Sequence, residues 1–316
     1  MKDKLVSVIV TTKNEEKNIE NCLKSIIYQT YRNIEIIVVD NASSDRTKEI
    51  ARKYTNLIFD KGPERSAQRN YGVGVSSGEY VMYIDADMIL GPELVYGCIA
   101  EMERDESVVG LYISEIILGK SFWSKARRFE RSFYDGTVID AARFIRKNLF
   151  LQVGGFDENM SSAEDWDLDR KLSNLGQLKV LGNHDLRVTC EYSDIPEIEL
   201  KRWEVEFVPF LYRNGVKYND QYKNALFHNE SDFNLLRYLN KKSYYSKDFF
   251  IYIGKYGKDD PFIKKQFGMS YRYFNVFLEN GKWEKLLIHP ILIFGMYLLR
   301  FIVGVIYLKN KYINTF

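Results

Sequence analysis

The 316-residue sequence predicts an α/β fold, in which helices cover both faces of a mostly parallel sheet. Short apolar runs alternate with segments of helical spacing from Leu5 to Arg104. The runs are apolar throughout, which is the pattern of parallel strands buried on both faces. Beyond Pro196 the alternation stops, and the chain becomes rich in Tyr, Phe and Lys. We therefore expect an α/β domain over 1–198 and a helical, basic and aromatic region over 199–316.

Each predicted strand is a short run of β-branched and aromatic residues between polar turns. These runs occupy 5–10, 34–39, 57–59, 80–87, 108–118, 178–181 and 186–190. Each predicted helix has apolar residues three and four apart, so that they share one face. The helices are expected at 15–28, 46–54, 65–75, 91–104, 120–134 and 162–175.

Composition is typical of a globular protein and excludes a disordered one, with 46% hydrophobic and 28% charged residues. The three cysteines, Cys22, Cys98 and Cys190, form neither a disulfide framework nor a metal-ligand spacing. A reducing compartment is therefore expected. The segment 1–4 runs directly into the first strand, so we expect no signal peptide.

Charge is distributed unevenly along the chain. From Lys201 onward, 19 Lys and Arg stand against 10 Asp and Glu, so this part carries +9 in a chain of net charge +2. A basic, aromatic region attached to an acidic domain suggests an anionic partner, either nucleic acid or a membrane. The sequence contains no zinc-finger or helix-turn-helix pattern, and its tail is apolar. We therefore expect a membrane surface and no nucleic acid.

Two carboxylates, Asp85 and Asp87, follow the buried run that begins at Tyr80. Side chains two residues apart on an extended chain point the same way, so both project from the strand end. Ligands of open α/β sheets bind beyond the carboxyl ends of the strands. Two acids converging there repel each other unless a hard cation or a polyol lies between them. The alternative is a solvated Asp-x-Asp in a surface turn.

Five blocks extend this pattern along the chain. They are Val6 to Asn14, Val38 to Asp45, Arg69-Asn70, Asp85-Ala86-Asp87, and Gly154 to Glu158 together with Glu164-Asp165. In order and spacing they resemble a family-2 glycosyltransferase of the GT-A fold. The resemblance covers 5–190 well. It extends more weakly to 241–247 and the tail, which are similar to the carboxyl ends of members that act on lipid-linked sugars.

The resemblance implies an enzyme that transfers a sugar from a UDP- or GDP-sugar. Breaking the glycosidic bond leaves charge on a diphosphate, and a divalent cation held by carboxylates neutralises it. We expect Mg²⁺ or Mn²⁺, with Asp87 as the direct ligand. By the family pattern, Asp85 contacts the ribose and supports the metal.

The same pattern implies six further substrate-binding residues, four of which have a structural alternative. Thr11, Lys13 and Glu15 line the first strand-to-helix turn, where the family binds the nucleotide, although Lys13 could simply be an exposed loop lysine. Asp40 could accept a hydrogen bond from the base, or it could be a helix-cap or turn aspartate. The last two, Arg65 and Arg69, could contact the donor diphosphate or form ion pairs on a helix surface.

An acidic pair at the start of a predicted helix is the candidate catalytic group. If the transfer inverts the anomeric centre, one base must remove the acceptor proton. We expect Asp165 to be that base, with Glu164 orienting it or the substrate. The alternative is a helix-start acid favoured by the helix dipole.

Two departures from the family pattern stand out. Several relatives place a histidine near the end of this domain as an extra metal ligand, but here the corresponding strand is 188–191 and the nearest histidine is His184. A third protein ligand is therefore not expected. Processive members carry Gln-x-x-Arg-Trp, whereas this chain has Arg202-Trp203 without the Gln. We therefore expect a non-processive enzyme.

The segment Leu286 to Leu308 is 23 residues long and is interrupted by His289-Pro290 and Arg300. Its length could span a membrane, but a central Arg costs about 2.5–3.5 kcal/mol on insertion scales. A re-entrant or in-plane helix and a buried core helix are the alternatives. The 120–134 helix combines aromatic and basic residues, and it could be an interfacial helix or could pack on the sheet.

These features together predict a helical, membrane-associating extension at the cytoplasmic face of the cell membrane, with the catalytic domain in the cytoplasm. The expected acceptor is a polyisoprenyl phosphate or a lipid-linked saccharide. Two rival functions remain open. A sugar-nucleotide pyrophosphorylase would need a Gly-rich basic loop after the first strand, which 11–15 is not. A non-catalytic membrane-recruited module would not need the intact carboxylates.

Overall fold

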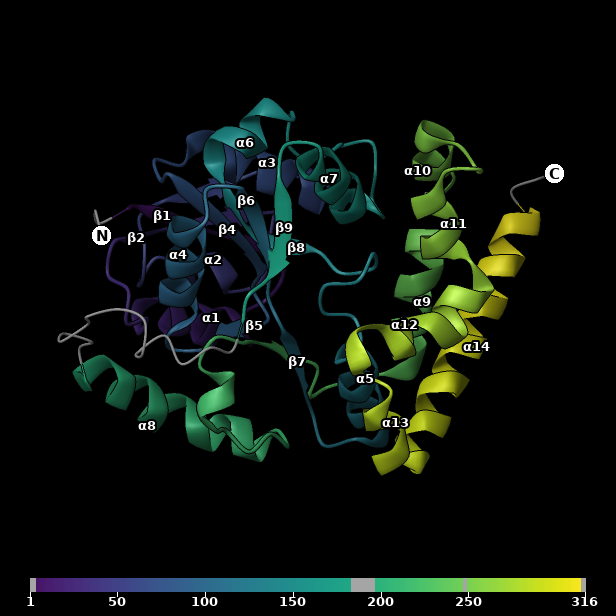
Figure 1. Ribbon diagram of the computed structural model, residues 1–316. Coiled ribbons are helices and arrows are strands. Elements are labelled where there is room, and N and C mark those ends of the chain that lie inside the picture. Colours follow the sequence, from purple (N-terminus) through teal and green to yellow (C-terminus); the bar gives the residue numbers. More distant parts are fainter. Residues whose placement is uncertain (1–3, 183–196, 247–248, 314–316) are drawn as a thin grey trace.

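The computed structural model describes residues 4–182, 197–246 and 249–313. Within these residues the main sheet has seven strands in the order β3-β2-β1-β4-β8-β6-β9, with helices on both faces (Figure 1). Its strands are β1 (Val6–Thr12), β2 (Ile34–Asp40), β3 (Ile58–Asp60), β4 (Tyr80–Asp85), β6 (Val108–Tyr112), β8 (Ala142–Arg146) and β9 (Gln177–Val180). The α/β fold with a mostly parallel sheet is confirmed.

The strands alternate their side chains between two apolar layers, as a sheet covered on both faces requires. Val8 and Val10 of β1 pack towards one layer, and Ile9 between them packs towards the other. The first layer is covered by α1 (Ile19–Ile27), α2 (Thr47–Ala51) and α4 (Leu94–Arg104). The second is covered by α3 (Arg65–Val75), α6 (Lys147–Gln152) and α7 (Glu164–Ser173).

The prediction of one strand over 108–118 is wrong, because this segment forms two strands in different sheets. After β6 the chain leaves the main sheet, and β7 (Glu115–Leu118) joins a second one. The second sheet has the order β5-β10-β7, with β5 at Met88–Leu90 and β10 at Leu226–Asn229. Both halves of 108–118 are apolar, so the pattern alone did not show the change of sheet.

The expectation that only helices and loops follow Pro196 is also wrong. Strand β10 pairs antiparallel with β5, which directly follows the Asp85-Ala86-Asp87 turn, and parallel with β7. The C-terminal region therefore reaches back to the candidate site. The boundary at 198 stays a prediction, and the predicted strand 186–190 lies outside the described residues.

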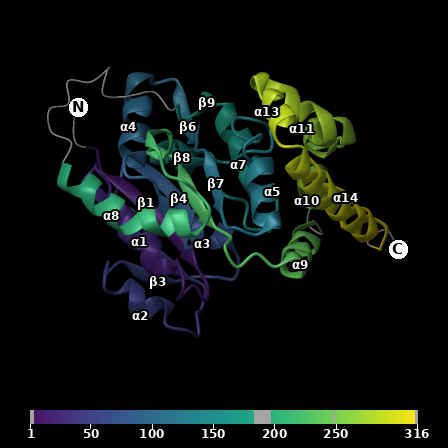
Figure 2. The ribbon, with the colours of Figure 1, turned by 90° about the horizontal axis from the view of Figure 1, so that it is seen from below.

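The remaining C-terminal elements are mainly helical. They are α8 (Glu197–Arg213), α9 (Leu235–Ser246), α10 (Phe249–Tyr256), α11 (Pro261–Phe267), the π-helical segment η3 (Tyr271–Asn275), α12 (Val276–Leu278), α13 (Glu284–Ile288) and α14 (Pro290–Ile313). Helices α9 to α14 gather to one side of the main sheet (Figure 2). Helix α8 instead lies near the second sheet, where Trp203 is buried and donates to the carbonyl oxygen of Leu90 at 2.8 Å. Trp203 of the Arg-Trp pair is thus part of the core.

Helix α5 (Phe122–Arg131) packs on α14 and on β7, which favours the packing alternative over an interfacial helix. Phe129 and Phe133 are buried. Three of its cations point inward, since Arg127 pairs with Glu230, Arg131 pairs with Glu115 and Asp140, and Arg128 donates to backbone carbonyls. Most of the rings and cations of this helix therefore have partners inside the protein, whereas Phe122 and Lys125 are exposed.

The apolar tail divides at His289 into α13 and α14. Among the described residues, one helix, Pro290–Asn310, is long and apolar enough to cross a membrane. Its Arg300 is buried against α5, where the Nε atom lies 2.8 Å from Glu130 Oε1. An apolar stripe on α14 recurs every three and four residues, at Ile291, Phe294, Leu298, Phe301, Val305 and Leu308, and all but Leu298 are exposed. One side of α14 therefore belongs to the protein and the other is uncovered and apolar.

Candidate active site

The candidate site lies at the carboxyl ends of β1 and β4. Thr11 and Asp85 are register partners on these parallel strands, so their side chains meet at the same edge of the sheet. The Thr11 hydroxyl donates to Asp85 Oδ1 at 2.9 Å. Two of the predicted residues are thus in direct contact.

A buried arginine joins this strand end to the candidate base. The NH2 atom of Arg69 lies 3.3 Å from Asp85 Oδ1, and its NH1 atom lies 2.9 Å from Asp165 Oδ1. Its guanidinium also lies over the rings of Tyr83 and Phe156, with centroid distances of 4.9 and 5.3 Å. Because Arg69 is 1% exposed, the structure favours the ion-pair alternative for it over direct contact with a donor.

The second arginine, Arg65, is closer to solvent. Its NH2 atom lies 3.3 Å from Glu164 Oε1, and its NH1 atom lies 3.7 Å from Asp85 Oδ2. Burial opposes ionisation of Asp85, but Arg69 and Arg65 together hold the pKa of this carboxyl well below its usual range. Asp85 is therefore an anion in the folded protein.

The block Gly154 to Glu158 fixes the approach to α7. Gly155 has φ +63°, and a Cβ there would lie 2.6 Å from Asn70 Oδ1. The Asn70 side chain accepts from the Phe156 amide and donates to the Phe156 carbonyl and to Glu158, each at 2.9 Å. In the Arg69-Asn70 block of α3, Asn70 thus holds this turn and Arg69 holds the candidate base.

Glu164 and Asp165 form the first turn of α7, directly after Ala163. Ala163 has a left-handed φ of +60°, which is costly for a residue with a Cβ and is concentrated at functional sites. Burial and the neighbouring Asp165 raise the pKa of Glu164 to about 7. Asp165 is the more accessible of the two, with its side chain 25% exposed against 5% for Glu164. This difference agrees with the roles expected for the pair.

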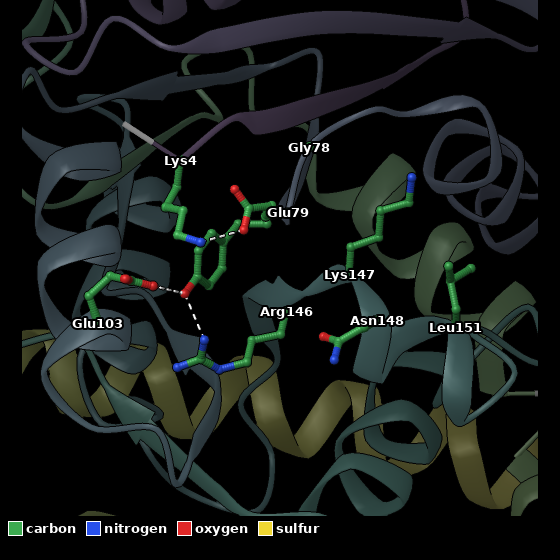
Figure 3. Close-up of a pocket in the computed structure, with 9 residues that line it drawn as sticks. Lys4, Gly78, Glu79, Glu103, Arg146, Lys147, Asn148 and Leu151 are labelled. Atoms are coloured by element: carbon green, nitrogen blue, oxygen red, sulfur yellow. Dashed lines mark hydrogen bonds and ion pairs between the residues drawn. The ribbon is translucent and has the colours of Figure 1, made fainter. Parts of the chain in front are cut away.

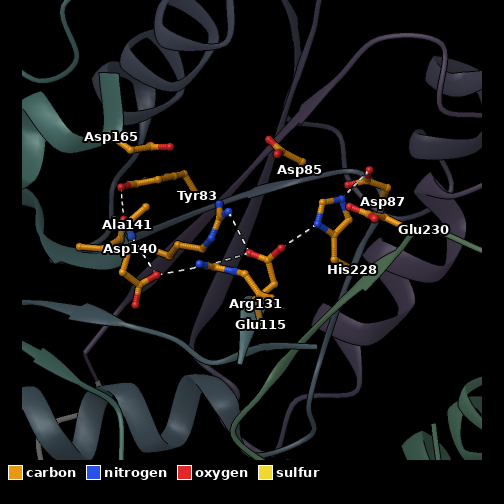
Figure 4. Close-up of polar contacts among 12 residues, drawn as sticks. Tyr83, Asp85, Asp87, Glu115, Arg131, Asp140, Ala141, Asp165, His228 and Glu230 are labelled. Atoms are coloured by element: carbon orange, nitrogen blue, oxygen red, sulfur yellow. Dashed lines mark hydrogen bonds and ion pairs between the residues drawn. The ribbon is translucent and has the colours of Figure 1, made fainter. Parts of the chain in front are cut away.

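Asp87 lies beside a histidine that sequence reasoning did not select. His228 of β10 places Nε2 3.1 Å from Asp87 Oδ2 and Nδ1 2.8 Å from Glu115 Oε1 (Figure 4). Arg131 and Arg143 in turn lie 3.3 and 3.4 Å from Glu115 Oε2. Burial disfavours protonation of the imidazole, but Asp87 and Glu115 raise the pKa of His228 well above its usual value.

The expectation of no third protein ligand stays a prediction, but it considered only the family position near 188–191. A histidine reaches Asp87 from β10, which pairs with the strand after Asp87. The available signal was the short apolar run that ends at His228, one of three histidines in the chain. His184 lies outside the described residues.

These groups fit a divalent cation. Asp87 Oδ1 is buried and has no hydrogen-bond partner among the described residues, so it has a free lone pair. A carboxylate that bonds the far nitrogen of a histidine fixes its ring for metal binding, and Glu115 does this for His228. Across the described residues, no group of three or more His, Cys, Asp and Glu is arranged to hold a metal alone. Substrate oxygens and water would have to complete the coordination.

The other predicted nucleotide residues have different surroundings. Glu15 is half-buried near the two aspartates, and burial raises its pKa. Lys13 is exposed on the loop after β1. Asp40 is fully buried and accepts from the amide and hydroxyl of Ser43 at 2.7 and 2.5 Å. These bonds favour the turn alternative, and contact between Asp40 and a base stays a prediction.

A pocket of about 440 Å³ lies elsewhere, at the opposite end of β4 (Figure 3). It is lined by charged residues that include Lys4, Glu79, Glu103 and Arg146, several of which pair with one another or with Tyr80. Parallel α/β sheets bind ligands at the carboxyl ends of their strands, and this pocket is at the amino end of β4. It is not part of the candidate site.

Comparison with known families covers the part of the candidate site that lies before Glu164 and His228. Residues 7–156 match the description Glycosyl transferase family 2. This segment includes β1, the Asp85-Ala86-Asp87 turn and the Gly-Gly-Phe motif. Residues 7–156 are therefore similar to family-2 glycosyltransferases.

The curated relatives of this chain are also named as glycosyltransferases. The chain is 35% identical over 140 residues to Glycosyltransferase GlyA of Streptococcus pneumoniae, covering 39% of this chain and 20% of that protein. It is 30% identical over 210 residues to an uncharacterised glycosyltransferase of Haemophilus influenzae, covering 55% and 62%. The chain thus spans between a fifth and about three-fifths of the length of these relatives.

A solved structure supports the fold over nearly the whole chain. It is the mannosyltransferase PcManGT from Pyrobaculum calidifontis in complex with GDP-Man and Mn²⁺, with a TM-score of 0.50 and 16% identity. The similarity covers 99% of this chain and 81% of that one. At this identity the similarity applies to the fold, which includes the helical C-terminal part.

Proposed function

We propose that the protein is an inverting, metal-dependent glycosyltransferase that moves a sugar from a UDP- or GDP-sugar to a lipid-linked acceptor. The observation that carries the proposal is the guanidinium of Arg69, which binds Asp85 on the donor side and Asp165 on the acceptor side. Group transfer requires two substrates held in one geometry, and a buried charge bound at both ends fixes that geometry. The acceptor class is a polyisoprenyl phosphate or a lipid-linked saccharide.

On the donor side, Asp87 and His228 would hold Mg²⁺ or Mn²⁺, with Asp85 supporting the site and contacting the ribose. The cation supplies positive charge to the diphosphate leaving group when it is bound. The free lone pair of Asp87 and the orientation of His228 by Glu115 support this assignment. The mannosyltransferase of similar fold is in complex with GDP-Man and Mn²⁺, which agrees with it. Thr11, Lys13, Glu15, Asp40 and Arg65 remain the proposed donor-contacting residues.

On the acceptor side, Asp165 would accept the proton of the attacking hydroxyl. Arg69 keeps Asp165 in place, and the partly exposed position of this carboxylate gives an acceptor access to it. Glu164 would orient the acceptor or the base, because its raised pKa lets it keep a proton near neutral pH and donate a hydrogen bond. A single displacement of the nucleotide by the acceptor oxygen that this base deprotonates inverts the anomeric centre.

The proposed location is the cytoplasmic face of the cell membrane, with α14 lying in the plane of the interface. Dissociating α14 from α5 would break the Arg300–Glu130 pair and leave a buried carboxylate without this partner. A helix that keeps one side on the protein and presents an uncharged stripe of six residues fits an interfacial helix better than a span.

The test is a screen of UDP- and GDP-sugars with the full-length protein and Mn²⁺, monitored by nucleotide release. We expect one or a few donors to be hydrolysed, with activity lost in EDTA and restored by the metal. Synthesis of a nucleotide sugar from sugar phosphate and nucleoside triphosphate would instead identify a pyrophosphorylase. If the protein neither binds nor hydrolyses any donor, the result would indicate a non-catalytic module.

A further inference from the structure

One face of α9 carries two lysines between two tyrosines. Tyr238, Lys241, Lys242 and Tyr245 follow a spacing of three, four and seven residues from the first, which places them on the same side of a helix. Such a stripe is unusual as a packing face, since it contains two cations at its centre. The groups that face it show what the stripe does.

The C-terminal end of this stripe lies against the candidate active site. The guanidinium of Arg65, which binds Glu164, lies 5.2 Å from the ring centroid of Tyr245. The adjacent Tyr244 hydroxyl donates to Glu64 at 2.7 Å, just before α3. Helix α9 therefore borders the arginine that contacts Asp85 and Glu164.

The other end of the stripe lies in a group of cations. The Tyr238 ring has Arg127 at 4.8 Å and Lys242 at 5.4 Å from its centroid. Arg272 of η3 lies 5.8 Å from the ring centroid of Trp166, the residue next to the candidate base on α7. The cations thus extend from α5 to the neighbourhood of Asp165.

The charges in this group do not balance. Arg127 pairs with Glu230 at 2.7 Å, and Arg300 pairs with Glu130 at 2.8 Å. Within 4–182, 197–246 and 249–313, no carboxylate lies within 4.0 Å of Lys242 or Arg272. Both side chains are nevertheless partly buried. Two positive charges are therefore withdrawn from water without an anion to compensate them.

Such an arrangement is costly unless an anion binds there. Burial lowers the pKa of Lys242 to about 7 and also lowers the pKa of Arg272, as expected for cations that lack a partner. The ring of Tyr238 compensates Lys242 only in part, because an aromatic face attracts a cation far more weakly than a desolvated carboxylate or phosphate does.

The same group is joined to the apolar helix α14. Asn310 donates to the carbonyl of Ser243 and to the hydroxyl of Ser246 on α9, at 3.0 and 2.7 Å. On the η3 side, the Tyr273 hydroxyl donates to the Arg300 carbonyl at 3.0 Å. The unpaired cations therefore belong to elements fixed to the helix that carries the exposed apolar stripe. Arg272 also lies beside Trp166, the neighbour of the candidate base on α7.

We propose that Lys242 and Arg272, assisted by Lys241, bind the phosphate or diphosphate group of the lipid-linked acceptor. The anion would neutralise the two unpaired charges, with its lipid tail directed to α14. The reacting oxygen, which belongs to the phosphate itself or to an attached sugar, would be directed to Asp165. This inference rests on the proposed function for the identity of the lipid, but its evidence is the charge imbalance and not the transfer chemistry.

The test measures binding of the full-length protein to phosphatidylcholine vesicles doped with undecaprenyl phosphate. Undoped vesicles and vesicles containing phosphatidylglycerol serve as the comparison. We expect Lys242→Met and Arg272→Met each to weaken binding to the doped vesicles by about tenfold, the effect of losing one charge-assisted contact. Lys217→Met removes an equal charge from an exposed position in the loop after α8 and should bind like the wild type. Lys242→Arg should restore most of the affinity, and inorganic pyrophosphate should compete.

Each outcome decides the inference. Loss of affinity confined to the doped vesicles supports it, and an equal loss on phosphatidylglycerol vesicles overturns it in favour of a general headgroup contact. Wild-type binding by both Met variants also overturns it. Circular dichroism of each variant establishes that it is folded, and rescue by Lys242→Arg separates lost charge from lost packing. Because vesicle binding requires no turnover, failure of the proposed transferase activity would be seen separately, in the donor screen.

Discussion

The site on the main sheet and the helical C-terminal region treat their charges in opposite ways. In the first, Arg65 and Arg69 are matched by Asp85, Glu164 and Asp165. In the second, Lys242 and Arg272 have no carboxylate partner among the described residues, and the stripe on α14 is uncovered. This difference supports the proposed division, in which the sheet site carries out the transfer and the C-terminal region binds an anionic lipid.

The largest expected effect concerns the sheet site. Asp87→Asn should lower turnover by about 10³-fold or more, because it removes a charged ligand that acts where the leaving group develops charge. It changes little volume, so the thermal unfolding temperature should stay close to that of the wild type. Steady-state kinetics and a thermal melt check both points. Full activity of the variant would contradict the role of Asp87.

Asp165→Asn should lower turnover by about 10²–10⁴-fold, the range that a general base contributes. Its donor affinity should be retained, because the base acts on the acceptor. Calorimetry with UDP or GDP checks this. If affinity fell in parallel with turnover, Asp165 would be a binding residue. A product with retained anomeric configuration would exclude the single displacement.

Three phenylalanine positions, two exposed and one buried, distinguish membrane contact from core packing. Phe294→Ser with Phe301→Ser should weaken vesicle binding by about tenfold per ring, since both rings are exposed on α14. Phe129→Ala on α5 should instead lower the free energy of unfolding by about 3–5 kcal/mol, because that ring is buried. Flotation and denaturant titration of the three proteins measure both quantities. Unchanged flotation of the double variant would exclude α14 as the membrane contact.

The smallest effect concerns the pH dependence of stability. Burial, together with Arg127, Lys241 and Arg272, lowers the pKa of Lys242 to about 7, against the opposing effect of Glu130. The unfolded chain keeps the ordinary value of 10.5, so it binds more protons than the folded chain between pH 7 and 10.5. Stability due to this group therefore rises with pH across that window. Lys242→Met should remove this contribution, and equal slopes for both proteins in denaturant titrations would contradict it.

The sequence predicted the parts of the fold that follow local periodicity. Helix α3 has the predicted bounds, and β1, β2 and β4 lie where apolar runs end in polar turns. The contact between Thr11 and Asp85 follows from parallel register alone. These features depend on residues close in sequence or on the general rule that ligands bind at strand ends.

The rest depended on contacts between distant segments. His228 lies 141 residues from Asp87, and nothing local to either residue indicates their pairing. The amphipathic patterns of α5 and α14 each define an apolar side, but they do not say what covers it. In the folded chain these two helices cover each other, so α5 is buried on its apolar side and α14 is left exposed on one.

The most direct test of the account measures how much metal the enzyme needs. The proposed metal site combines Asp87 of the sheet domain with His228 of the C-terminal region. Mn²⁺ is titrated into the full-length protein and into His228→Gln, with donor hydrolysis as the readout and the best donor from the screen as substrate. We predict that the variant needs about 10–100-fold more Mn²⁺ for half-maximal activity, as expected when a residue at a metal site is lost. The same Mn²⁺ dependence in both proteins, or activity that persists in EDTA, would contradict the assignment of the metal to Asp87 and His228.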